Sequence, residues 1–464
     1  MSKYEPVSAE VVAALQTALG AEYVRTDAET LEKYKTDEET DPRYHHLPEV
    51  VVWPGSTEEV AAVMKIANRY NVPVTPRSAG TSVSCGAIPV YGGIVLLLER
   101  MDKIEELNTE GMYMVVEAGA RTVEIQETAN AAGFLYAGDP CSADSCLIGG
   151  NIATNAGGNK AVRYGTTRDQ VYAIEAVTPT GDIVNVGARL KKKSTGYCLE
   201  QLIMGSEGTL GIITKATLKL LPLCPYKLDL LAIFTDLDKA VGLVPNLIKA
   251  GLNPTSVEFM DNAFVRSSSD YCELKLPHYE DGFYVIVTVE TFNEDELESK
   301  MEQLDEICSA SGATDVLEAV DRVWKLRRIC LESTRVLSLV STSDDLVVPV
   351  DQIANCIRHL TKVAENYSFK LFTLAHAGDG NLHFQILKGE MSDEQWEDEV
   401  SRFHAEAYPY VYSLGGRLSG EHGIGAKKVE AMEKYTEPEA LKRRQENNGR
   451  IVRKIILNQC RYST

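Results

Sequence analysis

In the segment His376-Ala-Gly-Asp-Gly-Asn-Leu-His383, Asp379-Gly380 is flanked by two apolar runs, Leu371–Ala375 and Leu382–Leu387. Asp-Gly between two runs of this kind favours a β-hairpin with a two-residue turn. A turn made by Asp379 and Gly380 pairs His376 with His383, and directly opposed residues share a face of the ladder, with Cβ atoms roughly 4.5–5.5 Å apart. The segment therefore predicts two imidazoles on the same face of a sheet.

A second segment, Ser419-Gly-Glu-His-Gly-Ile-Gly425, offers a carboxylate and another imidazole between glycines. Three of the eight histidines of the chain fall in these two segments. Two histidines and one carboxylate with an open position suit a catalytic Zn²⁺ or a non-haem Fe²⁺. We therefore expect a metal site that combines the histidine pair with Glu421-His422. The alternative is a β-turn with ordinary hydrogen-bonded histidines.

The bulk composition indicates a globular protein of two or three domains, because the chain has 464 residues, 44% of them hydrophobic and 25% charged. No apolar run approaches the ~18 residues that a membrane helix needs. The net charge of −20 argues against nucleic acid or an anionic membrane as the main partner. The ten cysteines form no CxxC pair, and residues 1–20 lack a signal-peptide pattern. We expect a cytoplasmic protein with reduced thiols and no iron–sulfur cluster of its own.

The order of predicted elements suggests how the chain divides. From Val50 the pattern is strand, helix, strand, and Ser56 precedes a helix whose apolar residues recur at helical spacing. The composition shifts at 221–225, alternating strands and helices follow, and the chain from Asp393 onward is mostly helical. We predict an N-terminal helix and first domain over 1–224, an α+β domain over 225–390 and a helical segment over 391–464.

Two glycine-rich loops lie in the first predicted domain. Pro76–Gly86 follows a strand, and its glycines allow backbone N–H groups to converge on an anion such as a phosphate. Cys146–Gly158 has four glycines and two asparagines, which let the backbone approach a flat ligand closely. Neither a Walker A motif nor a Rossmann G-x-G-x-x-G is present. A nucleotide cofactor here needs another fold, and an ordinary surface loop is the alternative for Pro76–Gly86.

Four motifs occur in a specific order: PRSAGTS (76–82), CLIGGNIATNAGG (146–158), HAGDGNLH (376–383) and SGEHGIG (419–425). Together they resemble flavoproteins of the vanillyl-alcohol oxidase type. The more similar branch is that of the FAD-dependent D-2-hydroxyacid dehydrogenases, with the D-lactate dehydrogenases and the catalytic subunit of glycolate oxidase. The resemblance implies an α+β protein with an FAD-binding domain of this type, an α+β substrate (cap) domain and a C-terminal helical segment that completes the active site.

The resemblance also implies which residues bind FAD. The pyrophosphate is expected at the first loop, at Pro76, Arg77, Ser78, Ala79, Gly80, Thr81 and Ser82. The flavin and ribityl chain are expected at Pro140, Gly149, Gly150, Asn151, Thr154, Gly157 and Gly158. Further contacts are expected at Tyr164, Gly165, Glu207 and Gly208. Because the first loop has no histidine to attach the cofactor, we predict non-covalent FAD.

In the same branch His376, His383 and Glu421 match the metal ligands, and His422 matches the general base. Arg327 matches an arginine that pairs with the substrate carboxylate, although 324–327 also fits a helix with exposed basic residues. The implied reaction oxidises a D-2-hydroxy acid to the 2-oxo acid, with the α-hydrogen leaving as hydride to the flavin. D-lactate is the preferred substrate, because no basic cluster suggests a second carboxylate.

The reduced flavin requires an external acceptor, because the chain suggests no haem, cluster or NAD site of its own. We expect an electron-transfer flavoprotein, an iron–sulfur subunit or a quinone, and direct use of oxygen is the nearest competing route. Three further functions are compatible with the sequence: oxidation of glycolate or another 2-hydroxy acid, a non-catalytic FAD-binding subunit, and a flavoenzyme for a phenol or sugar-derived alcohol. A homodimer is one expected oligomeric state.

Overall fold

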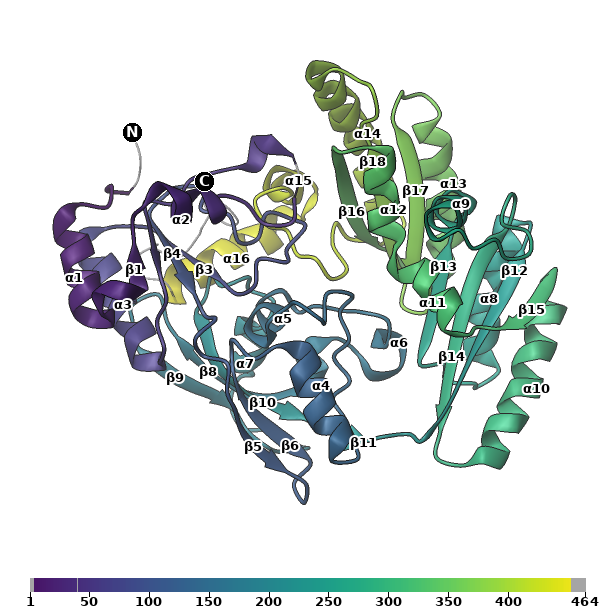
Figure 1. Ribbon diagram of the computed structural model, residues 1–464, viewed down its shortest axis with the longest axis horizontal. Coiled ribbons are helices and arrows are strands. Elements are labelled where there is room, and N and C mark those ends of the chain that lie inside the picture. Colours follow the sequence, from purple (N-terminus) through teal and green to yellow (C-terminus); the bar gives the residue numbers. More distant parts are fainter. Residues whose placement is uncertain (1–3, 40, 452–464) are drawn as a thin grey trace. The chain divides into compact units, whose positions relative to one another are not determined.

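The computed structural model describes residues 4–39 and 41–451, and the chain forms two compact units (Figure 1). The first unit takes residues up to 156, 166–223 and those from 422 on, and the second takes 157–165 and 224–421. The segment 391–464, expected as one helical piece, therefore divides between Glu421 and His422, and its residues 452–464 lie outside the described part.

A four-stranded sheet opens the first unit. Its strands are β1 (Val24–Arg25), β2 (Val50–Val52), β3 (Val74–Arg77) and β4 (Ile94–Leu97), in the order β1-β2-β4-β3. The pairs β2–β4 and β3–β4 are parallel. Helices α1 (Ala9–Leu19) and α3 (Thr57–Tyr70) contribute Leu15 and Met64 to the core with this sheet. As expected, Ser56 precedes α3, and its hydroxyl accepts the backbone N–H of Glu59 at 3.2 Å.

A five-stranded antiparallel sheet follows, in the order β5-β6-β10-β8-β9. Its strands are β5 (Ile104–Asn108), β6 (Tyr113–Glu117), β8 (Val171–Val177), β9 (Ile183–Gly187) and β10 (Ile212–Lys219). Helices α4 (Thr122–Ala131) and α5 (Ile148–Thr154) bury Ile125, Ile148 and Ile152 with it. The other elements of this unit are α2 (Ala28–Lys33), β7 (Phe134–Leu135), α7 (Leu199–Ile203), β11 (Leu221–Pro222), α15 (Val429–Tyr435), α16 (Pro438–Ile451) and the 3₁₀ turns Ala21–Tyr23, Pro42–Tyr44 and Thr167–Gln170.

The second unit is built on a seven-stranded antiparallel sheet in the order β15-β12-β14-β13-β17-β18-β16. Its strands are β12 (Tyr226–Phe234), β13 (Ser256–Met260), β14 (Phe283–Thr291), β15 (Asp315–Glu318), β16 (Ser341–Val347), β17 (Lys370–His376) and β18 (Asn381–Leu387). Its helices are α6 (Ala161–Tyr164), α8 (Leu237–Lys249), α9 (Asn262–Cys272), α10 (Glu294–Ala310), α11 (Asp321–Arg328), α12 (Cys330–Leu337), α13 (Ile353–Ala364) and α14 (Asp393–Ser413), with a 3₁₀ turn at Val350–Gln352.

One face of this sheet carries the polar residues that matter below. Met260 of β13 and Leu374 of β17 pack with Phe264 of α9 and Leu326 of α11. Since side chains along a strand alternate between faces, Glu258 and His376 share that face with Met260 and Leu374. In the part of the chain that the structure describes, no helix has the length and apolar character needed to cross a membrane.

Candidate active site

The hairpin formed by β17 and β18 differs from the predicted one in its turn. His376 pairs with Asn381 and Leu374 pairs with His383, so four residues (377–380) connect the strands and the two-residue turn is wrong. A two-residue type I′ turn needs positive φ at both central residues. Gly380 has φ of +86°, whereas Asp379 is not among the positive-φ residues, so Asp-Gly alone cannot close the hairpin.

The two histidines nevertheless lie on one face of the sheet. The register is shifted by two residues from the predicted one, and only an odd shift moves side chains to the other face. The ring centroids of His376 and His383 are 5.1 Å apart. The imidazoles are thus diagonal neighbours, close enough for one metal ion to reach both.

Glu421 completes a cluster of three potential metal ligands. Its Oε1 lies 3.3 Å from Nε2 of His376 and 3.1 Å from Nε2 of His383. The three ligand atoms all lie within 4.8 Å of one another, and the side chains are largely buried. The second unit therefore brings together the three residues expected to bind metal. Two imidazole nitrogens and one carboxylate oxygen are a donor set that fits Zn²⁺ or Fe²⁺.

Glu258 orients the first of these histidines. It is directly opposite His376 in the β13–β17 ladder, is fully buried, and places Oε1 2.8 Å from Nδ1 of His376. A carboxylate at Nδ1 holds the ring proton there and leaves Nε2 as the metal-binding atom. Glu258 was not among the site residues predicted from the sequence. The available signal was one acidic residue inside the apolar run Ser256–Met260, all of which is buried.

Arg327 lies behind this carboxylate. Its Nε and Nη2 donate to Oε2 of Glu258 at 3.0 and 2.7 Å, and the Arg327 side chain is 7% exposed. Arg327 is therefore on the buried side of its helix. The alternative for 324–327, a helix with exposed basic residues, does not describe this side chain. The guanidinium compensates a carboxylate that would otherwise be very costly to bury.

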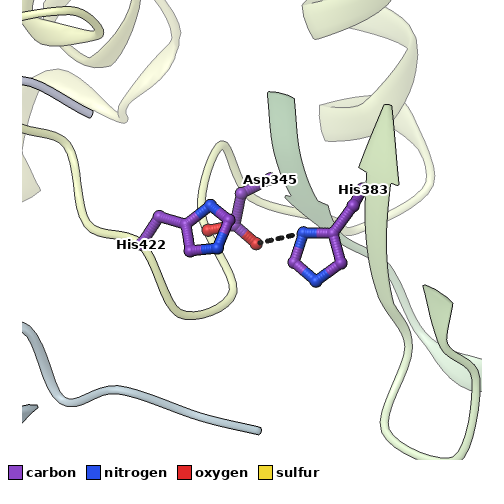
Figure 2. Close-up of side chains that lie close together, drawn as sticks. All are labelled: Asp345, His383 and His422. Atoms are coloured by element: carbon purple, nitrogen blue, oxygen red, sulfur yellow. Dashed lines mark ion pairs between the residues drawn. The ribbon is translucent and has the colours of Figure 1, made fainter. Parts of the chain in front are cut away.

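Asp345 fixes the segment that carries Glu421. Its Oδ2 accepts hydrogen bonds from the hydroxyl of Ser419 at 2.6 Å and from the backbone N–H groups of Gly420 and Glu421 at 3.1 and 3.0 Å. Its Oδ1 accepts from the Asn381 amide at 2.6 Å and faces Nδ1 of His383 at 3.8 Å (Figure 2). Each histidine of the cluster therefore has a buried carboxylate beside its Nδ1. Asp345, too, was not among the site residues predicted from the sequence.

The electrostatics favour ionised carboxylates at the cluster. Burial raises the pKa of Glu421, but the charges and hydrogen bonds of His376 and His383 outweigh it and hold that pKa well below its ordinary value. Burial likewise raises the pKa of Glu258, and His376 and Arg327 bring it below its ordinary value. In the hairpin turn, burial raises the pKa of Asp379 to about 6. Ionised carboxylates are the form that binds a cation.

The first unit holds most of the residues expected at FAD. The loop after β3 carries Pro76 to Ser82, and Nη1 of Arg77 donates to the carbonyl of Thr36 at 2.6 Å. Gly149, Gly150, Asn151 and Thr154 lie on α5, and a Cβ at Gly150 would be 3.1 Å from Cβ of Ser78. The two glycine-rich segments are therefore neighbours. Pro140 lies in the irregular segment before α5, and Glu207-Gly208 form a positive-φ turn before β10.

Four other expected FAD residues belong to the second unit. Gly157, Gly158, Tyr164 and Gly165 lie in the segment 157–165. The hydroxyl of Tyr164 donates to Glu290 at 3.1 Å, and the neighbouring Arg163 donates to the hydroxyl of Thr255 at 3.0 Å. His422 is the first residue of the last part of the first unit and follows Glu421 directly.

Comparison with known proteins gives the family of the chain. An FAD binding domain family matches residues 48–187, and the C-terminal domain family of FAD linked oxidases matches 227–445. The chain belongs to the FAD-linked oxidases. A D-lactate dehydrogenase of Anaerostipes hadrus is 36% identical over 82% of this chain and 82% of its own. For a glycolate oxidase subunit GlcD of Bacillus subtilis the identity is 33%, over 86% of each chain.

Solved structures confirm the fold of this FAD-linked oxidase. A p-cresol methylhydroxylase with substrate bound superposes with a TM-score of 0.84, at 16% identity over 98% of this chain and 96% of that one. A 4-ethylphenol oxidase of Gulosibacter chungangensis gives 0.79, at 17% identity over 100% and 99%. The predicted α+β fold, with an FAD-binding domain of the vanillyl-alcohol oxidase type followed by a second α+β domain, is confirmed. The protein is an FAD-linked oxidoreductase.

Proposed function

We propose that this FAD-linked oxidoreductase oxidises a D-2-hydroxy acid, D-lactate in the first instance, to the 2-oxo acid. The observation that carries the proposal is the convergence of His376, His383 and Glu421 on one face of the second sheet. The relatives named D-lactate dehydrogenase support the choice of substrate. Relatives named as a glycolate oxidase subunit make glycolate the second candidate, which needs the same chemistry at the carbon that bears the hydroxyl.

The proposed metal is Zn²⁺ or Fe²⁺, held by Nε2 of the two histidines and by Glu421. When bound, such an ion lowers the pKa of a hydroxyl group in its coordination sphere. Glu258 keeps the proton of His376 on Nδ1, and Asp345 keeps the backbone of Glu421 in place. These two carboxylates therefore preserve the ligand geometry that a substrate would meet.

His422 is the proposed base. A neutral imidazole can accept the substrate hydroxyl proton near neutral pH. His422 follows Glu421, a proposed metal ligand, directly in the chain, and this adjacency supports the assignment. FAD, when bound without a covalent link, would supply the oxidant for the α-hydrogen, which leaves the substrate as hydride. The proton and the hydride together account for the two hydrogens that the alcohol loses.

Arg327 has two proposed tasks that can be separated. It was expected to pair with the substrate carboxylate, and in the structure its Nε and Nη2 bind Glu258. Arg327→Lys keeps the charge but loses the bidentate geometry. A role at the substrate predicts a higher KM with unchanged metal content, whereas support of Glu258 alone predicts lower metal content with unchanged KM.

An external protein acceptor, an electron-transfer flavoprotein or an iron–sulfur subunit, is proposed to reoxidise the flavin, with a quinone as the alternative. The relatives named as a subunit of glycolate oxidase support a partner chain. Mixing reduced protein with purified electron-transfer flavoprotein, and separately with air-saturated buffer, measures which one reoxidises the flavin faster. Reoxidation by oxygen at the faster rate would favour an oxidase.

The experiment that tests the function is an anaerobic visible spectrum of the purified protein before and after addition of D-lactate, L-lactate or glycolate. We expect bleaching of a flavin spectrum by D-lactate and not by L-lactate. The variant His422→Ala should retain FAD and lose the bleaching. His359→Ala is the control, because this histidine stacks on Tyr410 between α13 and α14, away from the ligand cluster. A flavin spectrum unchanged by every 2-hydroxy acid, in protein with its metal, would contradict the proposal.

A further inference from the structure

The segment that follows His422 is docked within the first unit, on residues outside the ligand cluster. The hydroxyl of Ser84 donates to the carbonyl of His422 at 2.8 Å. Glu207 accepts two backbone hydrogen bonds, from Ile424 to Oε1 and from Gly425 to Oε2, both at 2.9 Å. One hydroxyl and one carboxylate therefore hold the backbone from His422 to Gly425 through three hydrogen bonds.

The glycines of this segment are required by that docking. Gly423 has φ of +83°, and a Cβ there would be 2.9 Å from the carboxyl carbon of Glu207. Gly425 has φ of +55°, and a Cβ there would collide with the carbonyl oxygen of Ser84. Glycine at 423 and 425 thus has a physical reason, since side chains at these two positions would crowd Glu207 and Ser84.

Glu207 itself is held in an unfavourable backbone conformation. Its φ is +53°, and Gly208 follows with φ of +76°. A non-glycine residue in this region is strained and persists where the surroundings fix it, often at functional sites. A charged acceptor makes stronger hydrogen bonds to backbone N–H groups than a neutral one. The turn at 207–208 therefore directs a carboxylate at the backbone after His422.

We infer that Glu207 is a positioning residue for His422, and this inference rests on the proposed role of His422 as the base. The carboxylate of Glu207 and the hydroxyl of Ser84 fix the backbone on the C-terminal side of His422, as Asp345 fixes the backbone up to Glu421. The turn at 207–208 was expected to contact FAD. The hydrogen bonds of Glu207 therefore connect an expected FAD contact with the backbone that carries His422, both within the first unit.

The test compares Glu207→Ala and Glu207→Gln with Glu49→Ala in the full-length protein. Glu49 is a matched control, because it is also half-buried in the first unit and accepts two backbone N–H groups, from Val7 at 3.4 Å and Gly93 at 2.9 Å. Glu207→Gln keeps the side-chain volume but can accept only one of the two hydrogen bonds. It serves if the alanine variant folds poorly.

The first measurement is backbone hydrogen exchange of peptides that contain Ile424 and Gly425, in protein without substrate. We expect exchange at least about tenfold faster in Glu207→Ala, an intermediate effect in Glu207→Gln and no change in Glu49→Ala. Unchanged exchange in both Glu207 variants would overturn the inference. This measurement needs no catalytic activity, so it stands apart from the proposed function.

The second measurement is the rate of anaerobic flavin reduction by D-lactate. We expect a limiting rate about 10–100-fold lower in Glu207→Ala, because a misplaced catalytic group loses rate without losing substrate binding. The rate is compared per bound FAD, because Glu207 is also an expected FAD contact, and the substrate concentration at half-maximal rate should stay as in the wild type. Faster exchange with an unchanged limiting rate would overturn the positioning role. Absence of flavin reduction in the wild type itself would count against the proposed function. The exchange measurement would then still test whether Glu207 holds the backbone at Ile424 and Gly425.

Discussion

Glu258 lies between two partners: its Oε1 is 2.8 Å from Nδ1 of His376, and its Oε2 accepts the Nε and Nη2 groups of Arg327. The carboxylate is fully buried on a strand, and Arg327 comes from helix α11. A buried carboxylate is stable only with this kind of compensation. The arrangement connects the position of the Arg327 guanidinium with the orientation of a proposed metal ligand.

Replacing Glu258 should weaken metal binding and the fold together. We expect Glu258→Gln to lower metal affinity about 10–100-fold, because the Nδ1 proton of His376 loses its charged partner. It should also destabilise the protein by about 3–5 kcal/mol, because Arg327 would stay buried without a carboxylate. Metal content after dialysis against a chelator and urea unfolding measure the two effects. The double variant Glu258→Gln with Arg327→Met should lose less unfolding free energy than the two single variants added together. A loss equal to that sum would refute the coupling.

Adjacent aspartates on β16 should behave differently. Asp345 faces the ligand cluster, whereas Asp344 faces α14, where its Oδ1 accepts from Tyr408 at 2.9 Å and its Oδ2 lies 2.7 Å from Nε2 of His404. We expect Asp345→Asn to lower metal affinity about 10–100-fold, because the Glu421 segment loses its charged acceptor. Asp344→Asn should cost stability and leave metal content unchanged. Equal metal loss in both variants would contradict this assignment.

The hairpin turn offers a test of backbone geometry with a matched control. Both Gly380 and Gly389 have positive φ, but a Cβ at Gly380 would collide with the carbonyl oxygen of Val348 and one at Gly389 would meet open space. Gly389→Ala should cost about 1–3 kcal/mol in strain, and Gly380→Ala should add about 1–3 kcal/mol of overpacking. Denaturant unfolding measures both. Only Gly380→Ala should also lower metal content, since it lies between the two histidines.

Asp261 should make stability depend on pH. Burial raises its pKa from 3.8 to about 7, against the hydrogen bonds from the backbone of Phe264 and Thr373. The folded protein therefore binds this proton more tightly than the unfolded chain, and the stability due to this group falls as pH rises from about 4 to about 7. We expect the wild type to lose up to about 4 kcal/mol relative to Asp261→Asn over that range, by urea unfolding. A constant difference would contradict this prediction.

Local patterns in the sequence predicted a large part of the architecture. The apolar spacing and Ser56 placed helix α3, and the runs around 376–383 placed β17 and β18. The register was wrong because hairpin signals depend on residue type, whereas the turn depends on φ, and Asp379 does not adopt the positive φ that a two-residue turn needs. The shared face survived, since it depends only on whether the shift is even or odd.

The sequence by itself determined the three ligand candidates, the glycine-rich segments and the family resemblance, because these reside in short motifs with fixed spacing. Only the tertiary structure decided what supports them. Glu258 is 118 residues from His376, and Glu207 is 217 residues from Ile424. Strand pairing and loop docking bring such residues together, and a single acidic residue in an apolar strand does not indicate its partner. The buried carboxylates therefore emerge only when the chain is folded.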